Sequence, residues 1–130
     1  NWTEIQKVVA SDREASSIFG SSASIHKDYA IIGASSESKD VTGENILNNA
    51  GAAYIFERDE VGNWIEAQKI VASDRGTGDL FGISVDIDDN YAVVGAFFEG
   101  EDLAGENTIP LAGAAYIFAP DATGSWAGTQ

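Results

Sequence analysis

Apolar and polar residues alternate along several short segments of this chain, and the same segments return 62 residues later. Within residues 83–88, Ile83, Val85 and Ile87 alternate with polar side chains, and this period of two predicts a β-strand with one buried face. The first half keeps the pattern more weakly, through Ala23 and Ile25. The alternation predicts strands, and no segment requires a helix.

A second kind of segment is apolar on both alternating faces. Residues 29–34 and 91–96 are of this kind, and so are residues 52–56 and 114–118. Strands that are apolar on both faces must be covered on both faces. These segments therefore predict strands of a sheet that is packed between other layers.

The period of 62 residues extends over the whole chain. Trp2, Trp64 and Trp126 are each 62 residues apart, and 32 of the 62 pairs between residues 1–62 and 63–124 are identical. Such a repeat is one supersecondary unit used again, with its core completed by neighbouring copies.

The outer strand of each unit is predicted from a mixed segment. Residues 64–72 combine apolar with charged side chains, as do residues 2–10, which is typical of a strand that is only partly buried. Each unit then has four antiparallel strands and one long polar loop, residues 35–49 or 97–111. We expect function in these loops, because binding residues are concentrated in loops.

Four antiparallel strands with two apolar faces describe a blade that stacks against other blades, as in a β-propeller. The chain has Phe81-Gly82, then YAVVGA at residues 91–96, then GAAYIF at residues 113–118. This order resembles the FG-GAP repeat, the blade unit of integrin α-subunit propellers and of many secreted or surface proteins. One motif position differs, because Ser35 and Phe97 stand where the family usually has proline. The resemblance implies an all-β fold with two four-stranded antiparallel β-propeller blades, part of a larger propeller or assembly.

The resemblance also divides the chain. Residues 1–18 are expected to be the outer strand and linker of a preceding or partner blade, residues 19–72 are blade 1, and residues 73–130 are blade 2 with a truncated last strand. Phe19 and Phe81 would wedge between adjacent blades. Glycines would allow the blades to approach closely where they converge; these are Gly20, Gly33, Gly82 and Gly95.

Two blades cannot close a propeller ring, because closed propellers have about four to eight blades. One interpretation is that the chain is a window on a longer repeat protein. The other is that copies assemble, with the N-terminal strand of one copy completing the last blade of another by strand addition.

Charge and composition restrict the function. The formal net charge is −14, from 21 acidic and 7 basic side chains, so the surface repels phosphate backbones and anionic lipids. We expect no nucleic-acid binding and no membrane insertion. The chain has no cysteine, and its single histidine, His26, corresponds to Asp88 in the second unit. Without a thiolate or a repeated general base, the sequence predicts that the chain is not an enzyme.

Cations are the partners that this charge favours, and Ca²⁺ is the candidate cofactor. The FG-GAP family commonly holds calcium in an Asp-x-Asp-x-Asp-Gly loop; Asp86, Asp88 and Asn90 stand there, but no glycine follows, and we expect that loop to be lost. Eight other side chains form candidate calcium loops, although a solvated acidic rim also explains them. They are Glu37, Asp40, Glu44 and Asn45, repeated as Glu99, Asp102, Glu106 and Asn107.

The resemblance implies a non-enzymatic extracellular or cell-surface module for adhesion, structural scaffolding or assembly. The expected partners are further copies of the same repeat, in the same chain or in a homo-oligomer or fibre, and an extracellular protein or carbohydrate. Carbohydrate would be bound by exposed aromatic residues such as Phe97 and Phe98. The alternatives are a carbohydrate-binding propeller and the non-catalytic propeller portion of a larger secreted hydrolase.

Overall fold

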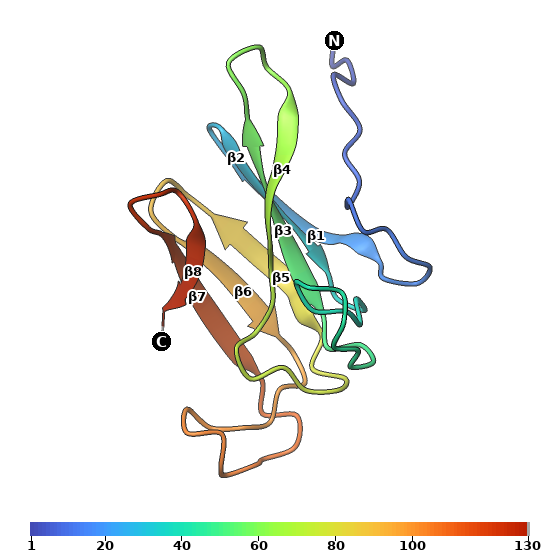
Figure 1. The fold of residues 1–130 in the computed structure, drawn as a ribbon, viewed down its shortest axis with the longest axis vertical. Coiled ribbons are helices and arrows are strands. Elements are labelled where there is room, and N and C mark those ends of the chain that lie inside the picture. Colours follow the sequence, from blue (N-terminus) through green and yellow to red (C-terminus); the bar gives the residue numbers. More distant parts are fainter. Residues whose placement is uncertain (130) are drawn as a thin grey trace.

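The computed structural model describes residues 1–129, whose strands form two four-stranded antiparallel sheets (Figure 1). Blade 1 has the strand order β1-β2-β3-β4, and blade 2 has the order β5-β6-β7-β8. No helix occurs among the described residues, and the all-β expectation is confirmed. The strands are β1 (Phe19–His26), β2 (Tyr29–Ala34), β3 (Ala52–Arg58), β4 (Trp64–Ile70), β5 (Phe81–Ile87), β6 (Ala92–Ala96), β7 (Ala114–Pro120) and β8 (Trp126–Thr129).

The first strand of each blade carries a bulge at its Phe-Gly pair, which both repeats share. The register with the following strand shifts between Phe19 and Ser22 in β1, and between Phe81 and Ser84 in β5. The glycine inside each bulge has a φ of 94°. Glycine adopts this conformation readily because it has no Cβ atom to clash with the backbone.

Residues 2–10 do not form the strand that we expected, because the described chain has no strand before β1. They nevertheless lie beside β4, where the Gln6 side chain donates to the Trp64 carbonyl oxygen (2.9 Å) and accepts from the Trp64 N–H (2.8 Å). The Gln68 side chain brackets Trp126 in the same way, at 2.8 and 2.7 Å. Residues 2–10 therefore hold, relative to blade 1, the position that β4 of blade 1 holds relative to blade 2. They lack a ladder because a strand needs a hydrogen-bonded neighbour, which β3 provides for β4.

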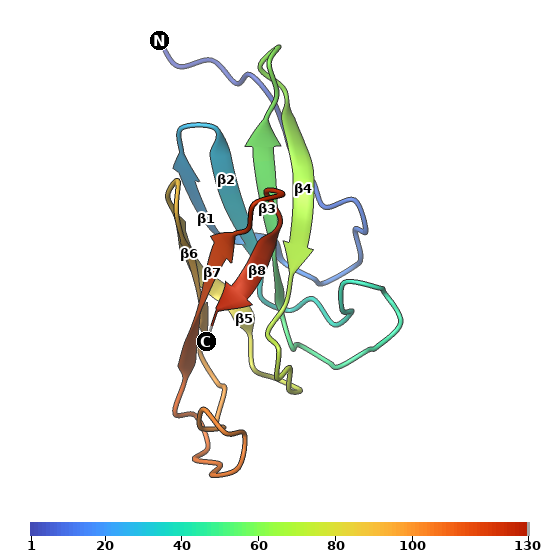
Figure 2. The same ribbon diagram turned by 60° about the vertical axis from the view of Figure 1, so that its left-hand side comes forward.

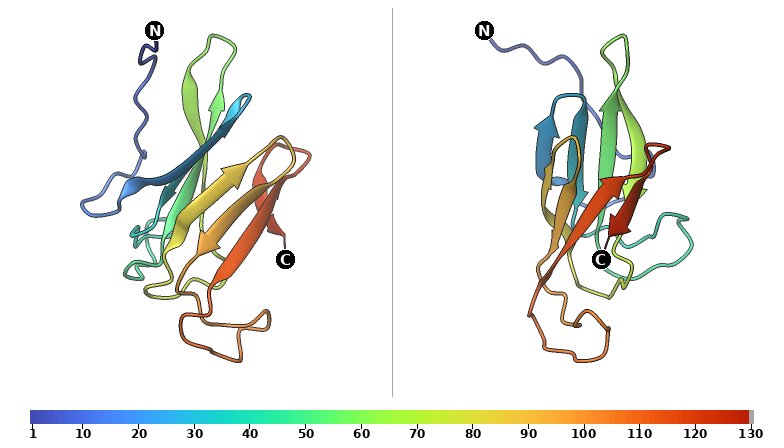
Figure 3. Two further views of the ribbon diagram at one scale, coloured as in Figure 1. Left: turned by 180° about the vertical axis from the view of Figure 1, so that it is seen from behind. Right: turned by 90° about the vertical axis from the view of Figure 1, so that its left-hand side faces the viewer.

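The two blades lie against each other, with β5 packed on β1 and β2 (Figure 2; Figure 3). Backbone touches backbone there: Gly51 and Phe81 form a parallel bridge, and the Ser22 hydroxyl donates to the Gly82 carbonyl oxygen (2.7 Å). A Cβ atom on Gly33 would lie 1.9 Å from the Gly82 oxygen, and one on Gly51 would lie 2.0 Å from the Phe81 oxygen. Glycine is required at both positions because no side chain fits between the two backbones.

The four glycines expected where blades converge divide into two pairs. Gly33 and Gly82 lie in the contact between the blades, as predicted. Gly20 has open space around it, and Gly95 faces only the Ser84 hydroxyl of its own blade. The pairs differ because Gly33 and Gly82 belong to the two facing sides, whereas the sides that carry Gly20 and Gly95 face no other blade of the described chain.

The main hydrophobic core fills the space between the blades. Ile31, Ala53 and Ile55 enter it from blade 1, while Phe81 and Val94 enter it from blade 2, and all five are fully buried. Ile31, Ala53, Ile55 and Val94 belong to the segments that predicted strands covered on both faces, and Phe81 is a residue that was predicted to wedge between blades. The core therefore belongs to the pair of blades and not to either blade alone.

A smaller apolar cluster covers the opposite face of blade 1. Tyr54 and Phe56 on β3 pack with Phe19 on β1, and the N-terminal segment adds Val8 and Ala10. Part of this face is thus covered by the segment that holds the outer-strand position.

Gly33→Ala is expected to reduce the free energy of unfolding by about 1–3 kcal/mol, because the new methyl group must displace the backbone of the neighbouring blade. Gly95→Ala is the matched control, since its Cβ atom would meet only the movable Ser84 hydroxyl at 2.3 Å. Urea melts of both variants measure the difference. Equal losses would show that the contact between the blades does not demand glycine.

Phe81→Ala is expected to cost about 3–5 kcal/mol, the usual range for a buried phenylalanine. The Phe81 ring makes edge contacts with Tyr116 (centroids 5.3 Å apart) and Phe118 (6.0 Å). Phe19 makes the equivalent contacts within blade 1 but is only half-buried, so Phe19→Ala should cost less. Denaturant melts in which the two variants lose the same stability would contradict the placement of Phe81 between the blades.

Candidate functional site

A buried lysine organises a polar cluster beside β3 and β4 of blade 1. Lys69 Nζ donates to Asp12 Oδ2 (2.6 Å) and lies 3.6 Å from Glu37 Oε2. The Tyr54 hydroxyl donates to Asp12 Oδ1 (2.7 Å) and lies 3.2 Å from Glu37 Oε2. We call Asp12, Glu37, Tyr54 and Lys69 the ammonium cluster; it joins the N-terminal segment, the loop after β2, and two strands of blade 1.

Local structure positions the members of this cluster. The β3–β4 register pairs Tyr54 with Lys69, so the two side chains stand on the same face of the sheet. Glu37 follows β2, and its Oε1 atom accepts from the N–H groups of Ser38 and Lys39, both at 2.8 Å. These bonds leave Glu37 Oε2 to face the ammonium group and the tyrosine.

Two pKa values in the ammonium cluster follow from burial and from these hydrogen bonds. Burial alone would raise the pKa of Asp12, but the hydrogen bonds from Lys69 and Tyr54 outweigh it and hold that pKa below its ordinary value. Burial, followed by the bond to Asp12, raises the pKa of Tyr54 far above its ordinary value. Asp12 therefore stays ionised and Tyr54 stays protonated at neutral pH.

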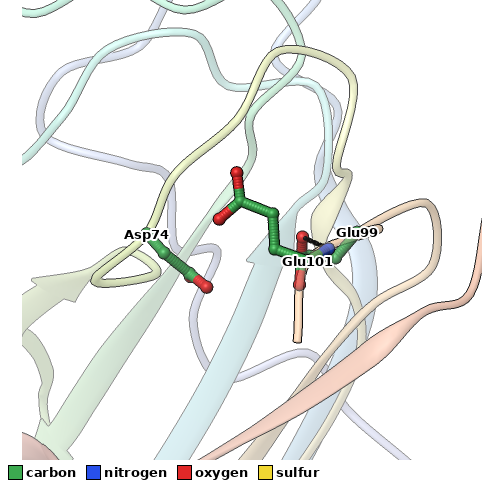
Figure 4. A group of neighbouring side chains, drawn as sticks. All are labelled: Asp74, Glu99 and Glu101. Atoms are coloured by element: carbon green, nitrogen blue, oxygen red, sulfur yellow. Dashed lines mark hydrogen bonds between the residues drawn. The ribbon is translucent and has the colours of Figure 1, made fainter. Parts of the chain in front are cut away.

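At the corresponding place in blade 2, the charged side chains that lie together are all carboxylates (Figure 4). The Tyr116 hydroxyl donates to Asp74 Oδ1 (2.6 Å), and one carboxylate oxygen each from Asp74, Glu99 and Glu101 lies within 4.8 Å of the others. Glu99 is buried, and its Oε1 atom accepts from the Glu101 N–H (2.6 Å). Among residues 1–129, no lysine, arginine or histidine pairs with these acids. We call Asp74, Glu99 and Glu101 the carboxylate cluster.

A fourth acid, Asp79, adds to the negative charge at this place. Burial raises the pKa of Asp79 even though the Gly76 backbone donates to it, and the charges of Glu99, Asp74 and Glu101 raise it further. The region around the carboxylate cluster is thus negative and partly removed from water. Such a site favours a cation, because a buried charge is costly without a counter-charge.

The eight predicted calcium ligands do not gather into two four-residue sites. Glu37 and Glu99 are buried in the two clusters described above, while Glu44 and Glu106 are exposed in the long loops. Among the described residues, the only three acids close enough to share a metal ion are those of the carboxylate cluster. The structure therefore groups Glu99 with two residues outside the predicted set, and calcium binding by the two loops stays a prediction.

Asp40 and Asp102 bind the backbone and side chains of their own loops. Asp40 accepts from the Thr42 N–H (2.9 Å) and from Asn45 Nδ2 (2.5 Å). Asp102 accepts from the Ala104 N–H (2.9 Å) and, like Asp40, from the amide nitrogen of an asparagine, Asn107 (2.5 Å). These asparagine bonds lower the pKa of Asp40 and that of Asp102. Both carboxylates thus organise their loops in the geometry observed.

The acids at the place of the family's calcium loop have separate partners. Asp86 Oδ1 accepts from the Ser24 hydroxyl of blade 1 (2.6 Å), whereas Asp88 Oδ1 accepts from the N–H groups of Asn90 and Tyr91 (2.7 and 2.8 Å). Asp86 thus joins the two blades, and Asp88 stabilises the turn between β5 and β6. The loss of the family's calcium loop stays a prediction.

Asp12, Tyr54 and Lys69 were not predicted from the sequence as members of a site. A signal was present, because each of the three has an identical residue 62 positions away: Asp74 for Asp12, Tyr116 for Tyr54 and Lys7 for Lys69. Identity in a duplicated unit also reflects duplication alone, so it could not separate these residues from the core.

The exposed aromatic pair in the second long loop is formed as expected. Phe97 and Phe98 make an edge contact with ring centroids 5.2 Å apart, and both side chains are exposed. Carbohydrate binding by this pair stays a prediction.

Lys69→Met is expected to lower the free energy of unfolding by about 2–4 kcal/mol, because it leaves buried Glu37 without its cation. The low pKa of Asp12 contributes stability that is present above about pH 4 and is lost as the pH falls through the folded-state pKa. The stability that is lost at acid pH should be smaller in Lys69→Met than in the wild type. Thermal melts between about pH 2 and pH 7, which span that titration, test both effects. Lys7→Met is the control, because Lys7 is the repeat counterpart of Lys69 but is exposed. At high dilution this substitution should change the free energy of unfolding by less than about 0.5 kcal/mol.

Comparison with known families agrees with the fold and with the repeat. Within the described part of the chain, no helix has the length and hydropathy to cross a membrane. No curated protein matches the chain. A family model described as the FG-GAP repeat matches residues 2–56 and again residues 64–118. The chain therefore belongs to the FG-GAP repeat family and is a β-propeller-type repeat module.

Proposed function

We propose that this chain is a non-enzymatic module that acts by stacking with further copies of the same repeat, in adhesion or scaffolding outside the cell or at its surface. FG-GAP repeats occur generally in extracellular and cell-surface proteins. The observation that carries the proposal is the exposure of one face of blade 2. The corresponding face of blade 1 is buried against blade 2.

Matched residues on the two blades measure this difference. Ile31 on β2 is fully buried, and its counterpart Val93 on β6 is 40% exposed. Ile55 on β3 is fully buried, and its counterpart Ile117 on β7 is 48% exposed. The exposed face has the same apolar character as the covered one, and exposed apolar patches of this kind mark interaction surfaces.

The backbone on the exposed face leaves room for another blade. Gly33 and Gly51 of blade 1 receive the Phe81-Gly82 backbone of blade 2. Their counterparts Gly95 and Gly113 meet no backbone atom of another blade, and the nearest backbone atom to a Cβ on Gly113 would be 3.4 Å away, in its own blade. A Phe-Gly bulge like that at Phe19 and Gly20 fits this space, because the blade 1–blade 2 contact is made of the same parts.

The partner in this arrangement is a further copy of the repeat, in the same chain or in a second copy of the chain that stacks head to tail. The exposed face of blade 2 would take the face of blade 1 that carries Ile25, since the counterpart of Ile25 is Ile87, a core residue between the blades. Ile25 is itself exposed. Such a heterologous interface propagates into a ring or an open fibre. A non-enzymatic role is supported by the single histidine and by the absence of cysteine from the sequence.

Sedimentation velocity tests the stacking with two complementary variants. The wild-type chain is expected to form oligomers whose size rises with concentration. Val93→Lys blocks the blade 2 face, Ile25→Lys blocks the blade 1 face, and each variant alone should be monomeric because a buried unpaired charge is costly. An equimolar mixture should form dimers and nothing larger, since each variant keeps one intact face.

Val61→Lys, in the exposed turn between β3 and β4, is the control and should assemble like the wild type. A wild-type chain that stays monomeric at all concentrations would refute the proposal. A mixture of Val93→Lys and Ile25→Lys chains that remains monomeric would refute the head-to-tail geometry.

A further inference from the structure

The long loop of blade 1, residues 35–49, is bound at its base by the linker that leads from β4 into blade 2. The linker runs beside this loop (Figure 1). Three backbone N–H groups of blade 2 donate to consecutive carbonyl oxygens where the loop ends: Gly78 to Asn48 (2.8 Å), Leu80 to Asn49 (3.1 Å) and Phe81 to Ala50 (3.0 Å). The base of the loop is therefore fixed by the neighbouring blade.

Residues 38–47 of this loop form a short hairpin, which we call the loop hairpin. An isolated antiparallel bridge joins Lys39 to Ile46, and residues 41–46 are exposed. Two backbone hydrogen bonds flank the bridge, from the Leu47 N–H to the Ser38 carbonyl oxygen (2.8 Å) and from the Asp40 N–H to the Asn45 carbonyl oxygen (3.3 Å). A two-stranded hairpin without a sheet beside it is only marginally stable, so contacts from outside decide whether it keeps its shape.

One side chain of the linker supplies such contacts. Arg75 Nη2 donates to the Ser38 carbonyl oxygen (2.9 Å), and Arg75 Nη1 donates to the Asn45 carbonyl oxygen (3.1 Å). These are the same two oxygens that accept the backbone bonds across the loop hairpin. Because the guanidinium group is planar and presents its donors as a fixed fork, a single arginine connects both arms of the hairpin.

The surroundings of Arg75 make these two bonds important to it. Its Nε atom is buried and has no hydrogen-bond partner among residues 1–129, and no carboxylate of that part of the chain pairs with the guanidinium group. Hydrogen bonds from a charged donor are stronger than those between neutral groups. The repeat counterpart of Arg75 is Arg13, which is exposed.

We propose that Arg75 is the positioning residue through which blade 2 fixes the shape of the long loop of blade 1. The loop hairpin then presents residues 41–46 in one shape only while the two blades are packed against each other. A partner that binds the loop in this shape strengthens the contact between the blades, because coupling between two events is reciprocal. The inference concerns two blades of one chain and does not depend on stacking with further copies.

Amide hydrogen exchange of the full chain, followed by NMR, tests the role of Arg75. In Arg75→Met the Asp40 and Leu47 amides should exchange about 10- to 100-fold faster than in the wild type, the range expected when hydrogen bonds from a charged group are lost. The Ile55 amide in β3 should keep its wild-type rate, because opening of the loop is local. Arg75→Lys should restore part of the protection, since lysine donates but lacks the fork. Arg13→Met is the matched control and should change neither rate.

A second pair of variants tests whether the loop depends on the packing of the blades. Gly33→Ala displaces the Gly82 backbone of blade 2 and lies outside the loop hairpin, so it should also accelerate exchange at Asp40 and Leu47. Adding Arg75→Met to Gly33→Ala should accelerate these amides less than Arg75→Met does alone, because both changes release the same loop. Gly95→Ala should leave the loop at its wild-type rate.

Each result decides for or against the inference. Unchanged exchange at Asp40 and Leu47 in Arg75→Met would overturn it, and so would equal acceleration at Ile55, which would mean that Arg75 stabilises the whole chain. Effects of Arg75→Met and Gly33→Ala that multiply in full would show that the loop keeps its shape independently of the contact between the blades. If Arg75→Met does not fold, Arg75→Gln replaces it, and the same acceleration confined to the loop is expected.

Discussion

The structure depends on one contact, the direct approach of two backbones at the Phe-Gly bulge. The carbonyl oxygens of Phe81 and Gly82 lie where a Cβ atom of Gly51 or Gly33 would have to be, and the bridge between Gly51 and Phe81 connects the two sheets. Because the backbones meet, the side chains on either side of the contact close into one core that excludes water. The bulge itself needs a glycine with positive φ, so the same short motif shapes the strand and seats it on the next blade.

The repeat makes this contact directional. Residues that correspond in the two blades touch each other across it: Ser24 donates to Asp86, and Lys27 pairs with Asp89, each pair being 62 positions apart. One blade contributes its Phe-Gly bulge and the other contributes Gly33 and Gly51, so the interface joins unlike surfaces. Among residues 1–129, one surface of each kind is left uncovered. This is why blade 2 exposes Val93 and Ile117 where blade 1 buries their counterparts.

The two blades also differ in how their buried charges are paired. Lys69 neutralises two acids brought together from the N-terminal segment and from the loop after β2, so the outer strand is held by an ion pair as well as by its ladder. The carboxylate cluster of blade 2 contains the corresponding aspartate and glutamate and accepts a hydrogen bond from the corresponding tyrosine, Tyr116, and no basic side chain pairs with it among residues 1–129. The strong negative charge of the sequence is therefore not spread evenly over a solvated surface, because Glu37, Glu99 and Asp79 are buried. The acids predicted as calcium ligands separate for this reason: Glu37 and Glu99 face these clusters, while Asp40 and Asp102 order their own loops.

The sequence by itself determined the period, the eight strands, and the identity of Phe81, Gly33 and Gly82 as interface residues, because alternation and repetition can be read without knowing which residues become neighbours. Only the tertiary structure decided the rest. Residues 2–10 have the pattern of a strand but form none, because a ladder requires a second strand beside them. Gly20 and Gly95 match their interface counterparts in sequence but face no other blade among the described residues. The ammonium cluster joins Asp12 to Lys69 across 57 positions, and no spacing rule connects residues so far apart. Which acids meet, and which meet a lysine, follows from how the blades stack.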